Sequence, residues 1–238
     1  MVAIQVEPYV FSEAVREFWQ SRDDAALKQQ QRGASDQGGR SAVTAGRHLD
    51  GFSRKIVESI AATGVDVEEV HTNTKVELPG FYRPSKEWDI VVVRAGQLRA
   101  AIELKSQVGP SFGNNFNNRT EEAMGSALDI WTAFREGAFL DSPTPFLGYL
   151  LLLEDSPKSR SPVEVKEPHF QVFEEFLDAS YIKRYELFCR KLVLERQYTA
   201  ACFLTSDRQL ADRPENYSEP ALDLSAERFL TQLLRHVA

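Results

Sequence analysis

The chain has 238 residues, 42% hydrophobic and 26% charged, a balance that is typical of a globular protein with a substantial core and excludes a collagen-like or wholly disordered one. Two cysteines exclude a disulfide framework, no apolar run approaches the roughly 18 residues of a membrane helix, and Met1–Val10 has no leader pattern, so we expect a cytoplasmic protein. The formal net charge of −7 excludes nucleic-acid binding through bulk positive charge, so such a partner would have to meet local basic clusters.

The first third of the chain has helical patterns. Apolar residues at helical spacing predict helices over 12–31 and 45–63, and Gly64 occupies the position where the second helix should stop. A basic stretch between Arg32 and Lys55 follows the first of these helices, overlaps the second and contains Arg40 and Arg47. These two arginines are candidate contacts for nucleic acid, although a solvated helix face is the commoner meaning of such a run.

The centre of the chain predicts a sheet. Two short apolar runs, 88–93 and 98–104, flank Ala95-Gly96-Gln97 and indicate a β-hairpin. The order of elements is that of a mixed α/β domain, in which a small central sheet is covered by helices. The remaining predicted elements are a polar loop over 106–119, a helix over 117–135, a strand over 146–153, a loop over 154–168, a helix over 170–196, a strand over 199–205 and a helix over 224–236.

The hairpin carries a candidate active site. If it turns symmetrically about Gly96, Asp89 lies directly across from Glu103, with their Cβ atoms about 5 Å apart. Lys105 shares the face of Glu103, because residues two apart on a strand point the same way. Like charges this close are costly unless a cation lies between them, and two carboxylates, the Leu104 carbonyl and water suit Mg²⁺. A surface ladder of ion pairs is the alternative, but here the charges interrupt apolar strands.

The polar stretch that follows is rich in side-chain amides. Asparagine and glutamine can match the edge of adenine, and arginine that of guanine, so this stretch is a candidate for reading DNA bases. A turn built from turn-forming residues is the alternative interpretation. The candidate residues are Gln107, Asn114, Asn115, Asn117, Asn118 and Arg119.

These residues carry a resemblance to a known family. Asp89 followed by Glu103-Leu104-Lys105 resembles the active-site motif of the PD-(D/E)xK nucleases, although Trp88 stands where that motif often has proline. The run 102–123, IELKSQVGPSFGNNFNNRTEEA, is similar to the corresponding stretch of XhoI-type restriction endonucleases. The degenerate nuclease motif is the weaker part of the resemblance, and the amide-rich run is the more specific part.

The resemblance implies a restriction-endonuclease-like fold over residues 1–238, with a helical N-terminal region (1–64) and a catalytic core (65–238). It implies a homodimeric, Mg²⁺-dependent Type II enzyme that cuts a palindromic hexamer, CTCGAG, and functions beside a cognate DNA methyltransferase. Asp89 and Glu103 become metal ligands with the Leu104 carbonyl, and Lys105 becomes the catalytic lysine. Many such nucleases use a further acid, for which Glu58 and Glu77 are the candidates.

Two other functions fit part of the pattern. A catalytically inactive DNA-binding or regulatory module could share the fold, but it would have no reason to keep Asp89, Glu103 and Lys105 together. Two carboxylates about 5 Å apart would also suit a retaining glycoside hydrolase. The lysine beside the pair and the lack of an evident aromatic platform for sugar count against that reaction.

Overall fold

The computed structural model of the chain describes the backbone of residues 5–32 and 48–238, and the side chains of residues 5–27 and 48–238. The glycine-rich stretch 33–40 and the candidate DNA contacts Arg40 and Arg47 lie outside the described residues. For these residues the expectations of the sequence stay predictions.

A five-stranded mixed sheet forms the centre of the molecule, with the strand order β1-β4-β5-β6-β7. The strands β1, β4 and β5 pair antiparallel, whereas β5, β6 and β7 are parallel. A separate two-stranded sheet is formed by β2 and β3. The strands are β1 (Val70–His71), β2 (Glu77–Pro79), β3 (Ser85–Glu87), β4 (Ile90–Arg94), β5 (Gln97–Gln107), β6 (Phe146–Glu154) and β7 (Ala200–Ser206).

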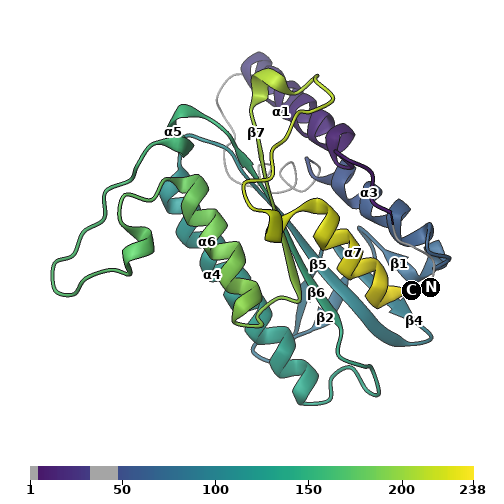
Figure 1. The fold of residues 1–238 in the computed structure, drawn as a ribbon. Coiled ribbons are helices and arrows are strands. Elements are labelled where there is room, and N and C mark those ends of the chain that lie inside the picture. The colour runs from purple at the N-terminus through teal and green to yellow at the C-terminus, as the bar shows by residue number, and fades with distance from the viewer. Residues whose placement is uncertain (1–4, 33–47) are drawn as a thin grey trace.

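Helices cover both faces of the sheet, as predicted for a mixed α/β domain (Figure 1). One face is covered by α1, α3 and α7, and the other by α4 and α6, because each helix buries an apolar stripe against the strands. The helices are α1 (Ser12–Arg32), α3 (Asp50–Ala61), α4 (Phe112–Arg135), α5 (Pro157–Arg160), α6 (Tyr181–Leu194) and α7 (Ala226–Val237), with 3₁₀ turns at Val67–Glu69, Glu174–Phe176, Arg208–Leu210 and Leu222–Leu224.

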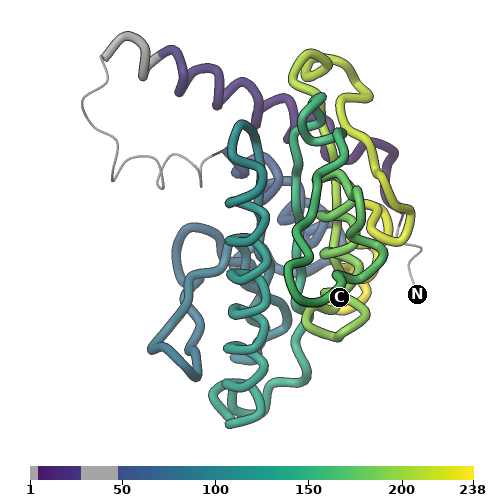
Figure 2. The backbone as a smooth tube through the Cα atoms, turned by 90° about the vertical axis from the view of Figure 1, so that its left-hand side faces the viewer, coloured from purple at the N-terminus to yellow at the C-terminus, as the bar shows by residue number. Residues whose placement is uncertain are grey.

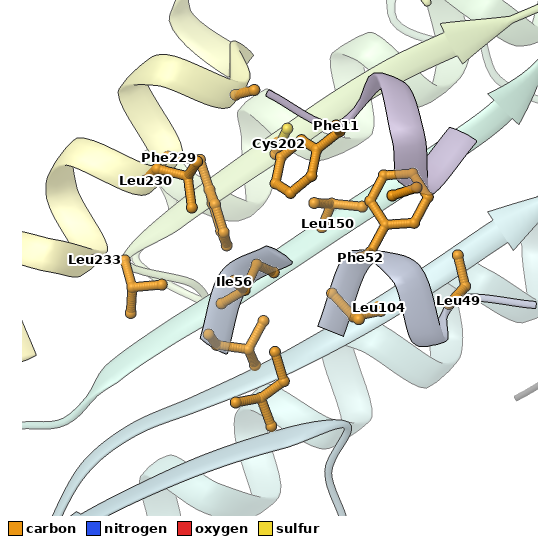
Figure 3. Packing of buried hydrophobic residues seen from close by; sticks show 14 of the residues in the cluster. Phe11, Leu49, Phe52, Ile56, Leu104, Leu150, Cys202, Phe229, Leu230 and Leu233 are labelled. Carbon is orange, nitrogen blue, oxygen red and sulfur yellow. The ribbon is translucent and has the colours of Figure 1, made fainter. Parts of the chain in front are cut away.

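The core on the first face joins the N-terminal helices to the sheet. Phe52 and Ile56 of α3 lie over Leu104 of β5 and Leu150 of β6, and all four side chains are at most 2% exposed (Figure 3). Phe229 of α7 packs into the same cluster. The side of β5 that carries Leu104 is therefore sealed by hydrocarbon, so any polar site on this strand must lie on the opposite face.

The predicted helix over 170–196 is wrong in its first part, because α6 begins only at Tyr181. Ser180 caps the helix by accepting a hydrogen bond from the Lys183 N–H, which is a local signal for a helix start. Phe170 and Phe173, which gave the sequence its helical spacing, are 88% and 75% exposed. A helix over these residues would bury no apolar stripe, so nothing in the core stabilises one there.

The predicted loop over 106–119 is also wrong, because β5 extends to Gln107 and α4 begins at Phe112. Phe112 is 2% exposed and stacks on Tyr181 with ring centres 5.5 Å apart. Phe116, one turn later, packs edge-on against Tyr185 of α6. These two anchors outweigh the low helix propensity of the asparagines between and after them.

The hairpin of β4 and β5 reaches the predicted register by a different route. Its turn is the two-residue Ala95-Gly96, both with positive φ (50° and 76°), so Arg94 pairs with Gln97. A bulge then shifts the register between Val92 and Val93 by one residue, and Ile90 pairs with Ile102. The symmetric turn about Gly96 is wrong, but the bulge restores the alignment expected at the carboxylate end.

Candidate active site

Asp89 lies immediately before β4 and extends the hairpin with both its backbone and its side chain. Its N–H donates to the Ile102 carbonyl at 3.1 Å, and its Oδ2 accepts the Leu104 N–H at 2.7 Å. Strand alternation places Asp89, Glu103 and Lys105 on the face of the sheet that carries the buried Val91 and Ala101. The three predicted residues therefore share the face covered by α4 and α6.

Glu103 is 2% exposed, and its carboxylate has three partners. Lys105 Nζ lies 2.8 Å from Oε1, and Lys86 Nζ, from β3, lies 3.1 Å from the same atom. The Tyr198 hydroxyl lies 3.1 Å from Oε2 and 3.2 Å from the Ala123 carbonyl. A buried charge needs this degree of compensation, and it fixes the carboxylate in one orientation.

The two carboxylates differ in proton affinity. Burial acts to raise the pKa of Glu103, but Lys105 and Lys86 outweigh it and lower that pKa below its ordinary value. At Asp89 burial dominates and raises the pKa, although Lys105 and the Leu104 N–H oppose the shift. Glu103 is therefore the firmly ionised member of the pair, while Asp89 gains most from any further positive charge nearby.

The oxygen donors at this edge suit a hard divalent cation. The Leu104 N–H is directed at Asp89, and since the N–H and C=O of one strand residue point to the same side, the Leu104 carbonyl also faces Asp89. Two carboxylates and one carbonyl are the donor set that Mg²⁺ accepts when water completes its coordination. Within residues 5–32 and 48–238 no group of three or more His, Cys, Asp or Glu side chains could hold a metal ion.

A groove of about 660 Å³ runs from this edge along α4. Its sheet side presents Lys86, Glu103 and Lys105, and its outer rim is the loop between β2 and β3, which lies beside α4 in Figure 2. The side chains of Lys86 and Lys105 keep 14% and 22% of their surface exposed here, so a negatively charged group can approach the two lysines from solvent. The full lining is Tyr82, Arg83, Lys86, Glu103, Lys105, Arg119, Glu121, Glu122, Gly125, Ser126, Leu128 and Asp129.

The candidate base-reading residues divide into two groups. Asn114, Asn117 and Asn118 are exposed on the first turns of α4, whereas Asn115 is half-buried. Arg119 is also half-buried, forms an ion pair of 2.6 Å with Glu122 and lines the groove.

Gln107 is placed differently from the asparagines. It is 2% exposed, and its side-chain amide donates to the Val108 carbonyl at 2.7 Å. The exposed amides are free to contact a ligand, while the amide of Gln107 holds the end of β5.

The structure does not bring the two candidate further acids to the pair. Glu58 is exposed on α3, on the opposite face of the sheet, 3.4 Å from Lys55. Glu77 is exposed on β2 and pairs with Glu87. The acids that line the groove beside Glu103 are instead Glu121 and Glu122 of α4, together with Asp129.

Lys86 and Tyr198 are the site residues that the sequence analysis did not identify. Tyr198 is separated from Glu103 by 95 residues, so no spacing relates them. Lys86 lies on a short strand that the apolar pattern does not mark. The Lys-x-Trp-Asp order of 86–89 is the one available signal, because alternation places Lys86 and Trp88 on the same side of an extended segment that leads into Asp89, and Lys86 Nζ lies 4.3 Å from the centre of the Trp88 ring.

Comparison with known proteins identifies the class of this chain. The family model of the restriction endonuclease XhoI matches residues 28–219. The chain is 54% identical over 213 residues to the Type II restriction enzyme BstVI of Geobacillus stearothermophilus, covering 87% of this chain and 95% of that protein. It is 44% identical over 210 residues to the Type II restriction enzyme XhoI of Xanthomonas vasicola, covering 87% and 79%, and 49% identical over 160 residues to AbrI of Azospirillum brasilense, covering 67% and 72%. No solved structure matches the chain.

The chain therefore belongs to the XhoI restriction endonuclease family, as the resemblance of its motifs predicted. As a member of this family it is a restriction endonuclease, a site-specific deoxyribonuclease. Across the described ranges, no helix is long and apolar enough to cross a membrane.

Proposed function

We propose that this protein is a Mg²⁺-dependent, homodimeric Type II restriction endonuclease that cuts both strands of DNA at CTCGAG. The observation that carries the proposal is the convergence of Asp89, Glu103 and Lys105 on one face of the sheet, beside a groove open to solvent. The printed names of BstVI and XhoI as Type II restriction enzymes support the reaction class. A cognate DNA methyltransferase would protect the host's own sites.

Each residue of the site has a distinct role in this proposal. Asp89 and Glu103, with the Leu104 carbonyl, would hold the divalent ion, which when bound neutralises phosphate charge and lowers the pKa of water. Lys105 would place its ammonium against the scissile phosphate and stabilise the negative charge that develops there. Lys86 and Tyr198 would keep the Glu103 carboxylate in position by their contacts at 3.1 Å.

DNA recognition would use the elements around the groove. The exposed amides of Asn114, Asn117 and Asn118 on α4 are proposed to contact base edges, together with Asn115 and Arg119. Gln107 would instead support this surface, because its buried amide holds the end of β5. Arg40 and Arg47, which lie outside the described residues, are proposed to contact DNA as well. A two-fold symmetric protein matches a palindromic site, with one half-site for each subunit.

Digestion of plasmid DNA of known sequence tests the proposal. With Mg²⁺ we expect discrete fragments whose mapped ends lie at CTCGAG, and EDTA should abolish cutting. The variant Glu103→Ala should lose cleavage by at least about 100-fold and still bind the CTCGAG duplex, because it removes a ligand but not the recognition surface.

A control variant and three contrary outcomes distinguish this proposal from its alternatives. Glu227→Gln removes an exposed carboxylate of α7, on the other face of the sheet, and should cut normally. A smear of fragments would indicate a non-specific nuclease, and binding without any cutting by the unmodified chain would indicate an inactive DNA-binding module. Normal cutting by Glu103→Ala would show that the active site lies elsewhere.

A further inference from the structure

Two large aromatic side chains are held in solvent at the rim of the groove. They lie in the rim loop, defined as residues 80–84 between β2 and β3. Phe81 is 50% exposed and Tyr82 is 66% exposed, and their rings meet edge to face with centres 5.0 Å apart. Surface aromatics that pack on each other rather than into the core form a small apolar patch.

The rim loop is tied to α4 by one buried carboxylate. Asp129 is 4% exposed, and its Oδ1 accepts the N–H groups of Phe81 and Tyr82, each at 2.8 Å. Its Oδ2 lies 2.7 Å from Arg83 Nε. Gly80 permits this approach, since a Cβ at that position would lie 2.6 Å from Asp129 Oδ2 and 2.7 Å from the Arg83 carbonyl oxygen.

The hydrogen bonds between Asp129 and the rim loop add little buried apolar surface to the core. Phe81 and Tyr82 leave at least half of their surface in water, so the hydrogen bonds to Asp129 order a segment that contributes little apolar burial. An ordered loop with exposed aromatics is pre-organised for a ligand, because the entropy of fixing it has already been lost before binding.

The lining of the groove indicates which ligand the rim loop would contact. Tyr82 and Arg83 line the same groove as Glu103 and Lys105, so whatever lies over the catalytic face also meets the rim loop. We propose that the rim loop is a DNA-contacting element, in which Phe81 and Tyr82 pack against deoxyribose and base faces beside the scissile phosphate. This inference rests on the proposed function and extends it to a surface that the sequence analysis did not identify.

DNA fits this patch better than a second protein chain. A stable protein interface buries about 1,200–2,000 Å² in total, far more than two aromatic side chains provide. Arg83, 44% exposed, lies next to the pair, and Lys86 follows on β3, so cations accompany the rings in the groove. Aromatic rings that contact bases, with cations that contact phosphates, are the pattern found in nucleic-acid grooves.

The test measures duplex binding by Phe81→Ala and Tyr82→Ala in the Glu103→Ala background, over a range of salt concentrations. Each variant should bind the CTCGAG duplex and a scrambled duplex at least about fivefold more weakly, since stacking of a base on an aromatic ring is sequence-tolerant. The slope of log affinity against log salt should not change, because no phosphate contact is lost. Gly80→Ala, which displaces the loop but keeps both rings, should weaken binding similarly.

Phe170→Ala removes an aromatic ring that is 88% exposed and lies outside the groove, and it should bind both duplexes normally. Unchanged affinity of the Phe81→Ala and Tyr82→Ala variants, a reduced salt slope, or loss of dimerisation in place of DNA contact would overturn the inference. If the unmodified enzyme fails to cut CTCGAG, the proposed function fails, and the scrambled duplex still decides whether the rim loop contacts DNA.

Discussion

Glu103 receives its partners from three parts of the chain. Lys105 belongs to its own strand, Lys86 comes from the separate sheet, and Tyr198 precedes β7. When a buried charged group loses one of its partners, its charge is less well compensated, so each of these contacts with Glu103 is costly to lose. The orientation of the carboxylate is therefore set by tertiary structure, although its presence on the strand is set by local sequence.

We expect Tyr198→Phe to weaken the response to divalent ions. The substitution removes the hydroxyl that contacts Glu103 Oε2 at 3.1 Å and leaves the ring in place. Loss of a group that orients a metal ligand commonly lowers ion affinity by 10–100-fold. The midpoint of a Mg²⁺ titration, followed by calorimetry and by cleavage, should move to about tenfold higher concentration.

Tyr185→Phe is the matched control for this change. Its hydroxyl is also buried, and among the described residues it has no hydrogen-bond partner. The control should keep the Mg²⁺ midpoint of the unmodified chain. A shift of equal size in both variants would mean that packing, and not the contact with Glu103, controls ion binding.

The part of the site that strand alternation determines was predictable from the sequence. Glu103 and Lys105 are two residues apart on β5, so they share a face whatever surrounds them. The contacts of Lys86 and Tyr198 with Glu103 depend on how distant elements pack, and no local pattern encodes that packing. Glu58 shows the same limit, because an acid on α3 cannot be placed on either face before the packing of the helix is known.

At the scale of elements, α4 joins the candidate active site to the proposed DNA-reading surface. Its buried stripe, which includes Phe112, Ala123 and Ile130, packs against the sheet and α6. Its first turns carry the exposed Asn114, Asn117 and Asn118. Further along the helix, Asp129 accepts hydrogen bonds from the rim loop. One helix therefore sets the relative positions of the amides, the groove and the loop.

The double variant Asn117→Ala, Asn118→Ala should separate stability from recognition. Both side chains are exposed in the interior of α4, where alanine has the higher helix propensity by about 0.5 kcal/mol per residue. The thermal midpoint should stay level or rise, while affinity for the CTCGAG duplex falls more than affinity for a scrambled duplex.

The control on the same helix is Met124→Ala, which truncates a side chain that is 52% exposed. It should leave both DNA affinities unchanged. If the asparagine variant loses affinity equally for both duplexes, these amides contact the DNA backbone rather than its bases.

Elements were predictable where burial and pattern agree. The apolar runs of β6 and β7 are buried along nearly their whole length, and the sequence located both strands to within a residue or two. The prediction failed where aromatic residues follow helical spacing without burial, as at Phe170 and Phe173. It also failed where buried anchors override poor helix formers, as at the start of α4.

At the scale of the whole molecule, an acidic chain must bind an acidic polymer. The net charge of −7 opposes DNA at long range, so we propose that binding depends on cations gathered in the groove, such as Lys86, Lys105 and Arg83. Two subunits on one duplex would double these local contacts, and this is consistent with the proposed dimer.

We expect the enzyme to sediment at about twice the 26.9 kDa of one chain. Each subunit would then cut one strand, so mixed dimers of unmodified and Glu103→Ala chains should nick plasmid DNA and yield open circles. Gel analysis of a mixing series measures this product.

A mass of one chain, together with linear product but no open circles from the mixture, would mean that a single subunit cuts both strands. The unmodified enzyme alone, assayed under the same conditions, provides the reference for complete double-strand cleavage.

The bulge in the β4–β5 hairpin has a consequence for how this chain can change in length. Arg99 is the unpaired extra residue, since Val92 pairs with Ala100 and Val93 with Leu98. Deleting Arg99 would remove the bulge and keep Asp89 across from Glu103, because Val93 would still pair with Leu98 and Val92 with Ala100. The hairpin can therefore lose one residue between these two acids without separating them, so the number of residues between Asp89 and Glu103 is not fixed by the site.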